Sequence, residues 1–161
     1  MASVWSELNL GKIQVPGDDR EKYFIKEISS SDTAASSFTL TADDQVNMIQ
    51  TISGWGVTKD AIEVQTIRKS GKILGSISNN DLSCVWNYVK TDVEYLKAAV
   101  QTGKRFLIVD TYNYGTGDEI EDAVIGGFGE YSNDESIGDA KTFNISFAVE
   151  EFVPAANITL P

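Results

Sequence analysis

The chain has 161 residues, of which 42% are apolar and 23% are charged. This is the length of one domain and the composition of a globular protein, which disfavours disorder, collagen-like repeats and coiled coil. We therefore expect a single domain over residues 1–161, with an N-terminal arm at about residues 1–17 and a C-terminal tail at about residues 153–161.

Acidic side chains outnumber basic ones, 24 to 13, and the formal net charge is −11. Such a surface repels phosphate groups, so specific recognition of duplex nucleic acid is not expected. The densest basic cluster is Arg68, Lys69 and Lys72, which is too small to reverse this balance.

The chain has no histidine and only one cysteine, Cys84. This removes histidine-based catalytic triads, Cys and His zinc sites and an intramolecular disulfide. Cys84 has no basic neighbour in sequence that would favour a thiolate, so we expect it to be buried and structural. Paired carboxylates are present, but adjacent residues of a strand point to opposite faces, so solvated charges are favoured over a hydrolase. We predict no catalytic residue, no cofactor and no metal.

The first twelve residues have no basic run followed by an apolar stretch, so they do not predict a secretory signal. No apolar run approaches the roughly 20 residues of a membrane-spanning helix. We expect a protein that starts in a cytoplasm and does not enter a membrane.

In chain order, the first predicted element is a weak helical turn at residues 43–52. Trp55 follows between two glycines and is predicted to be the most exposed tryptophan. A strand is predicted at residues 61–67, and the Lys-Ser-Gly-Lys turn at 69–72 suits a hairpin into Ile73 and Leu74.

The next three elements are a strand, a helix and a strand. The strand at 83–89 contains Trp86, which we expect in the core. A helix is predicted at about residues 92–102, because Thr91 and Glu94 fit a capping box and Gly103 fits a left-handed C-terminal cap. The strand at 105–112 contains four consecutive apolar residues, which indicates burial on both faces.

The last third of the chain predicts two further strands. The strand at 123–131 contains three glycines, which indicate a bulge or the close approach of another backbone. The strand at 142–150 alternates apolar residues with Thr142, Asn144 and Ser146, so one of its faces is small and polar. Residues 29–37, 114–122 and 133–139 are predicted loops, and residues 154–161 a flexible tail or an arm that orders against a neighbour.

Residues 60–152 contain three segments that together resemble one family. They are Lys-Ser-Gly-Lys-Ile-Leu-Gly at 69–75, Gly-Lys at 103–104 before the Val-Asp-Thr strand, and the ending from Phe-Gly-Glu-Tyr-Ser to Phe-Asn-Ile-Ser-Phe-Ala-Val-Glu. The chain resembles the tail tube proteins, or major tail proteins, of long-tailed bacteriophages. The resemblance implies a mainly β (α+β) fold, an antiparallel β-sandwich or partly closed barrel with one short flanking helix.

The same resemblance implies a non-enzymatic structural protein. Hexameric rings of the chain would stack into a tube through which DNA passes, and the partners would be further copies and other tail proteins. The protein would belong to the virion tail and be assembled in the bacterial host cytoplasm.

Two surfaces follow as expectations. The polar face of the final strand, Thr142, Asn144 and Ser146, is the candidate lining of the lumen, and outer solvent is the alternative for it. The candidate residues for subunit contacts are Val4, Trp5, Leu8, Trp55, Arg68, Lys69, Lys72, Ile158 and Leu160.

Two other functions remain open at this point. The chain could be another tail-assembly protein, such as a tail terminator or the tube of a contractile injection device. It could also be a carbohydrate-binding β-sandwich, with Trp55 and the tyrosines at 112, 114 and 131 as a platform for sugar rings.

Overall fold

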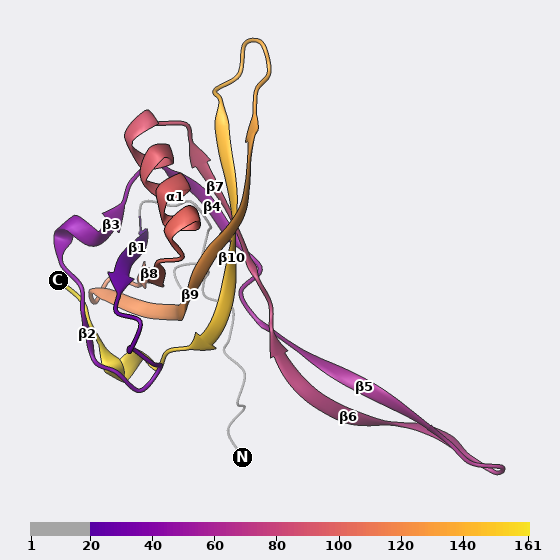
Figure 1. The fold of residues 1–161 in the computed structure, drawn as a ribbon. Helices are drawn as coiled ribbons and strands as arrows, with labels where there is room; N and C mark the ends of the chain where they lie inside the picture. Colours follow the sequence, from indigo (N-terminus) through magenta and orange to yellow (C-terminus); the bar gives the residue numbers. More distant parts are fainter. Residues whose placement is uncertain (1–19) are drawn as a thin grey trace.

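The computed structural model describes residues 20–161, and its main unit is a seven-stranded antiparallel sheet in the order β3-β1-β8-β9-β10-β7-β4 (Figure 1). The strands are β1 (Glu21–Ile28), β3 (Gln45–Val46), β4 (Ile49–Ser53), β7 (Leu82–Asn87), β8 (Arg105–Asn113), β9 (Asp118–Asp134) and β10 (Thr142–Phe152). The described residues contain one α-helix, α1 (Lys90–Thr102). The predicted mainly β class with one helix is confirmed.

The sheet curls towards a barrel and stays open. Its two edge strands, β3 and β4, are separated in the chain only by Asn47 and Met48, so the edges must lie near one another. They are not hydrogen-bonded to each other. The backbone oxygen of Met48 instead accepts a hydrogen bond from the backbone N–H of Asn87, at 2.8 Å.

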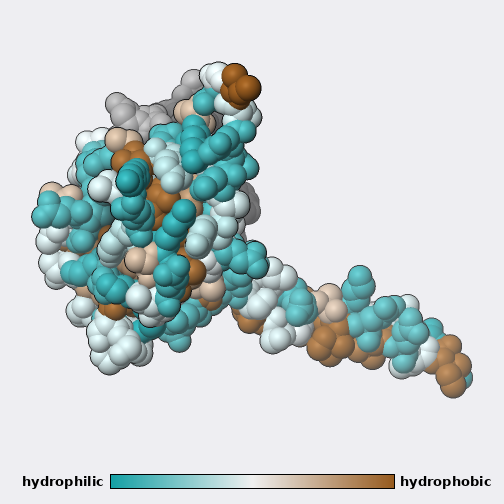
Figure 2. Space-filling view, turned by 45° about the horizontal axis from the view of Figure 1, so that its top comes forward, coloured by the Kyte–Doolittle hydropathy of each residue, from teal (hydrophilic) through white to brown (hydrophobic). Residues whose placement is uncertain are grey.

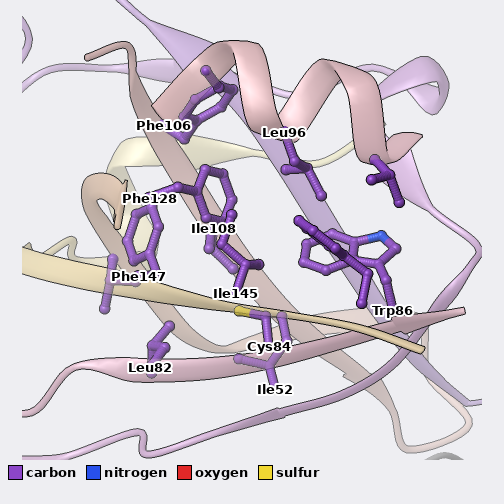
Figure 3. Packing of buried hydrophobic residues seen from close by; sticks show 14 residues of the cluster. Ile52, Leu82, Cys84, Trp86, Leu96, Phe106, Ile108, Phe128, Ile145 and Phe147 are labelled. Carbon is purple, nitrogen blue, oxygen red and sulfur yellow. The ribbon is translucent and has the colours of Figure 1, made fainter. Parts of the chain in front are cut away.

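Each face of the sheet has its own core. On one face α1 covers a cluster that includes Trp86, Leu96 and Phe106, which point into the space between helix and sheet (Figure 3). On the other face Leu107 and Val109 contact a smaller layer formed by β2 (Phe38–Thr39) and β11 (Ile158–Thr159), which pair in parallel. Strand β8 contributes to both cores, which confirms its predicted burial on both faces.

The helix ends as predicted but starts earlier. Gly103 adopts a left-handed conformation with φ 65° and closes the last turn. The first turn begins at Lys90, and Val89 occupies the N-cap position without a side-chain cap. The capping box predicted for Thr91 is therefore wrong, because the backbone oxygen of Val89 already accepts the first helical hydrogen bond, from Val93, at 3.0 Å.

The predicted helical turn at residues 43–52 is also wrong for most of its length. A short 3-10 turn, η2 (Ala42–Asp44), is followed directly by β3 and β4. Ile52 lies opposite Cys84 in the sheet and is buried there. Pairing with β7 therefore decides this segment, and its β-branched residues suit a strand.

The hairpin predicted near residue 70 is present and much longer than expected. Strands β5 (Val57–Gln65) and β6 (Ser70–Asn79) form a separate two-stranded sheet that projects from the body as an arm (Figure 1). Its turn lies at residues 66–69, not 69–72, because Thr66 bonds Lys69 through both its backbone and its hydroxyl. The strands consequently include residues that were predicted as turn.

Strand β9 is longer than predicted at both ends, so residues 118–122 and 133–134 are strand and not loop. Its glycines permit the predicted close approach. A Cβ on Gly126 would lie 1.9 Å from the backbone oxygen of Ala148 on β10. Only a residue without a side chain fits there.

The segment after Phe152 is ordered on the body. Val153 donates a backbone hydrogen bond to Ala123, and η3 (Ala155–Asn157) leads into β11. The prediction of a flexible tail, or one that orders only against a neighbour, is therefore corrected. The tail belongs to the second core of its own chain.

Candidate assembly interface

The arm formed by β5 and β6 presents most of its apolar side chains on one of its two faces. Residues directly opposite in an antiparallel pair share a face. Ile62 and Ile73 lie opposite each other on one face, and Leu74 lies opposite Ala61 on the other. These side chains are largely exposed, Ile73 at 56% and Leu74 at 68%, and Figure 2 shows the apolar surface along the arm.

Within residues 20–161 nothing covers these faces. The hydrogen bond from Asn79 Nδ2 to the backbone oxygen of Glu150, at 2.9 Å, ties the base of the arm to β10. An isolated two-stranded hairpin is at best marginally stable in water, and it leaves both outer edges unpaired. An exposed apolar surface of this kind is typical of a site for another chain.

The tip of the arm is basic. The turn closes with a hydrogen bond of 2.7 Å from the Thr66 backbone N–H to the Lys69 backbone oxygen, and Ile67 at its apex is fully exposed. Arg68 and Lys69 lie in the same turn, and Lys72 of β6 lies opposite Glu63 of β5. Three of the residues predicted for subunit contacts are thus brought together on one projecting element.

Trp55 lies at the base of the arm, where the backbone bends. Gly54 has φ 98°, and a Cβ there would lie 2.5 Å from the backbone oxygen of Asp81, so this bend requires glycine. Trp55 is half-buried and packs against the first core. Of the two tryptophans in residues 20–161 it is the more exposed, since Trp86 is 2% exposed.

The polar face of β10 is continuous with neighbouring strands. Asn144 and Ser146 lie opposite Val85 and Ser83 of β7. The side-chain amide of Asn144 donates to the carboxylate of Asp134 on β9, at 2.6 Å. These side chains and Thr142 point away from the core, so they form a small-residue, polar to acidic surface on the middle of the sheet.

The remaining candidates for subunit contacts are placed differently. Ile158 is only 8% exposed in the second core, and Leu160 is partly buried against it. The reason for expecting them at an interface, apolar side chains without a local core, therefore fails. Val4, Trp5 and Leu8 lie outside the described residues.

A carboxylate cluster on β1, β8 and β9 was not predicted. Asp110 lies opposite Tyr23 and Asp122, and its Oδ1 is buried with no hydrogen-bond partner. The pKa of Asp110 is raised to about 7, first by burial and then by the nearby charges of Glu21, Asp122 and Glu121. The sequence does contain a feature that could have indicated this buried carboxylate, because Asp110 directly follows the four buried apolar residues at 106–109. In residues 20–161 no group of three or more acidic or sulfur side chains is placed to hold a metal ion.

The aromatic residues considered for sugar binding do not form a platform. Trp86 is 2% exposed, in the core as predicted, and Tyr112 is fully buried. Tyr131 packs its ring against Phe143, with centroids 5.6 Å apart.

Cys84 is buried as predicted, and burial raises the pKa of its thiol to about 12. In the described part of the chain no helix has the length and apolar character needed to cross a membrane.

No family model and no curated protein matches this chain in sequence. The structure is similar to the sheath/tube terminator of the PVC extracellular contractile injection system, with a TM-score of 0.56 and 12% identity over 94% of this chain and 98% of that one. It is similar to the tube-terminating cap of the anti-feeding prophage, with a TM-score of 0.54 and 15% identity over 95% and 97%.

A third similar structure is the SPP1 tail tube, with a TM-score of 0.51 and 18% identity over 83% of this chain and 75% of that one. All three are components of tubes or of their ends. The chain therefore has the fold of tail tube and tube terminator proteins, and its structural neighbours are assembly proteins rather than enzymes.

Proposed function

We propose that this chain is a structural subunit of a phage tail tube, forming hexameric rings that stack around a channel for DNA. The observation that carries the proposal is the β5–β6 arm, whose apolar face, with Ile62 and Ile73, has no cover within residues 20–161. The partners are further copies of the chain and other tail proteins. The location is the virion tail, after assembly in the bacterial host cytoplasm.

The arm supports self-association by its chemistry and by its shape. Burying an isoleucine or leucine that is half exposed contributes on the order of 1 kcal/mol. The arm carries several such residues, among them Ile62, Ile73, Leu74 and Ile77. Because the arm differs from every surface of the body, an arm-to-body contact that is not reciprocated is heterologous, and heterologous contacts generate rings or filaments.

The polar face of β10 supports the channel. A surface of Thr142, Asn144 and Ser146 beside Asp134 carries no positive charge, so it gives phosphates no strong binding site. The overall charge of −11 acts in the same direction. We assign this face to the lumen of the proposed ring.

A second candidate function is a tube terminator. The two terminator structures match nearly the whole of both chains, whereas the tail tube match covers 83% of this chain and 75% of that one. A terminator ends a tube and does not extend it. The two candidates therefore differ in whether rings stack.

Negative-stain electron microscopy and mass photometry of the purified protein, over a range of concentrations, test both. We expect rings with six-fold end views that stack into tubes, and a double variant Ile73→Ser/Leu74→Ser that stays monomeric. The control is Ile137→Ser, because Ile137 is even more exposed than Ile73 and Leu74 but lies in the β9–β10 loop. Rings that never stack would favour the terminator. Monomers at every concentration, unchanged by the arm variant, would contradict both.

A further inference from the structure

A pocket of about 450 Å³ lies between α1 and the segment that joins η2 to β4. Its floor is aromatic and aliphatic, from Trp86, Leu96 and Phe106. These three side chains also belong to the first core (Figure 3), so the floor is rigid. A pocket of this volume has room for more than one side chain.

The rim of the pocket is acidic. Asp43 and Asp44 lie on one side of it and Asp92, in the first turn of α1, lies on the other. None of the described lining residues is basic. Met48, which is 44% exposed, also lies on the rim, and its flexible thioether adapts to an incoming group. The ligand that fits such a site has an apolar body and positive charge beside it.

The arm tip has this chemistry. Ile67 is fully exposed at the apex of the 66–69 turn, and Arg68 and Lys69 flank it on its C-terminal side. The structure pairs neither cation with a carboxylate among residues 20–161, although the whole chain is strongly acidic. The most basic projecting element and the acidic pocket are therefore complementary.

A chain cannot fill its own pocket with its own tip. The arm leaves the body beside β4 and β7 and extends away from it, whereas α1 lies across the opposite side of the body (Figure 1). The tip can reach the pocket only on another copy, and such a contact is heterologous. Each copy then has both a tip and a pocket, so the same contact can repeat from one copy to the next.

We propose that the pocket between α1 and the 43–48 segment receives the Ile67–Arg68–Lys69 tip of the arm of a second copy. Ile67 contacts the floor formed by Trp86, Leu96 and Phe106. Arg68 and Lys69 lie against Asp43 and Asp92. The inference rests on the proposed self-assembly and adds to it the surface that accepts the arm.

Disulfide cross-linking between two singly substituted chains tests the contact. Ile67→Cys protein is mixed with Met48→Cys protein under mild oxidation, and the joined peptides are identified by mass spectrometry. Cys84 does not interfere, because it is fully buried and the pKa of its thiol is about 12. Ile137→Cys replaces Ile67→Cys in the control, since both positions are fully exposed.

We expect the Ile67→Cys to Met48→Cys cross-link in assembled protein, at a yield at least about tenfold above the control, which corresponds to about 1.4 kcal/mol. Adding Arg68→Glu and Lys69→Glu to the tip should remove this difference. Adding Asp43→Lys to the Met48→Cys chain should restore part of this difference in yield, because the tip is then acidic and the rim of the pocket carries a positive charge.

The outcomes separate this inference from the proposed function. Tubes or rings that form without the cross-link would overturn the pocket as the acceptor and leave the proposed function standing. A cross-link of Met48→Cys to Trp5→Cys in the same chain would overturn it too, and place the N-terminal segment in the pocket. If the copies are cross-linked specifically but never form rings, the contact between tip and pocket would be supported and the proposed tube would be contradicted. Monomers without it would contradict both.

Discussion

The body and the arm of this molecule use apolar residues in opposite ways. In the body, the apolar side chains of β8 and β10 are buried in the cores of the sheet. In the arm, a ribbon of comparable strand length displays apolar side chains to solvent, mainly along one face. The body therefore buries its apolar side chains within the chain, whereas the described residues offer no surface that would bury those of the arm.

The two regions are therefore under different constraints. Residues of the body are constrained by packing in the monomer, so substitutions there change stability. In the proposed assembly, residues of the arm are constrained by what they contact on another copy, so we expect substitutions there to change association.

The largest effect is expected from a large-to-small change in the core. Phe106 is 1% exposed and contacts the ring of Phe128, with centroids 5.1 Å apart. Phe106→Ala should lower the free energy of unfolding by about 3–5 kcal/mol, because it removes buried contacts and leaves a cavity. Ile73→Ala on the arm should change it by less than about 0.5 kcal/mol. Urea unfolding at concentrations where the protein is monomeric measures both, and equal losses would refute the division.

The next effect concerns the contact between β9 and β10. Gly126→Ala should lower the free energy of unfolding by about 2–3 kcal/mol, because its Cβ cannot fit against the Ala148 backbone without moving a central strand. Gly127→Ala is the matched control, since the nearest atom to its Cβ would be 3.6 Å away. Thermal unfolding of the two variants compares them directly. Similar midpoints would mean that the two strands separate easily at this point.

A smaller effect depends on pH. Asp110 has a folded-state pKa of about 7 against the ordinary 3.8, so the folded protein holds this proton more tightly than the unfolded chain. Its contribution is most favourable below pH 4 and is lost as the pH rises towards 7. Because Asp110 is partly exposed, solvent screening reduces the loss to about 1–2 kcal/mol.

Asp110→Asn should therefore be more stable than the parent at pH 8 by about 1–2 kcal/mol and little different at pH 4. Urea unfolding at the two pH values measures the change. Asp60→Asn on the exposed arm is the control and should show no such dependence on pH. A stabilisation by Asp110→Asn that is equal at both pH values would assign the effect to packing.

Local patterns predicted the body better than the arm. The alternation in β10, the apolar run in β8 and the glycines of β9 each reflect contacts that every copy makes, and those strands are confirmed. The start of α1 and the strands at 45–53 were missed because sheet pairing and a backbone oxygen at Val89 decide them, not local propensity.

The candidate site could be predicted only in part. Arg68, Lys69 and Lys72 were identified from charge, but the length of the arm was not, because its apolar residues read as an ordinary core hairpin. The reverse error was made for Ile158, whose neighbours in the second core, such as Phe38, lie near the other end of the described chain. Asp110 and the pocket beside α1 depend on strands and segments distant in sequence, so local periodicity could not reveal them.

The position of β10 in the sheet has a consequence for biosynthesis. Strand β10 lies between β9 and β7 although it follows both in the chain, and β11 pairs with β2 near the other end of the described residues. A nascent chain that stops before residue 142 has β7 without its central neighbour and an arm that is already complete. Such long-range contacts form slowly, and unpaired edges promote misassociation. Translation of the last strands therefore determines when a copy becomes a finished building block instead of an aggregation hazard.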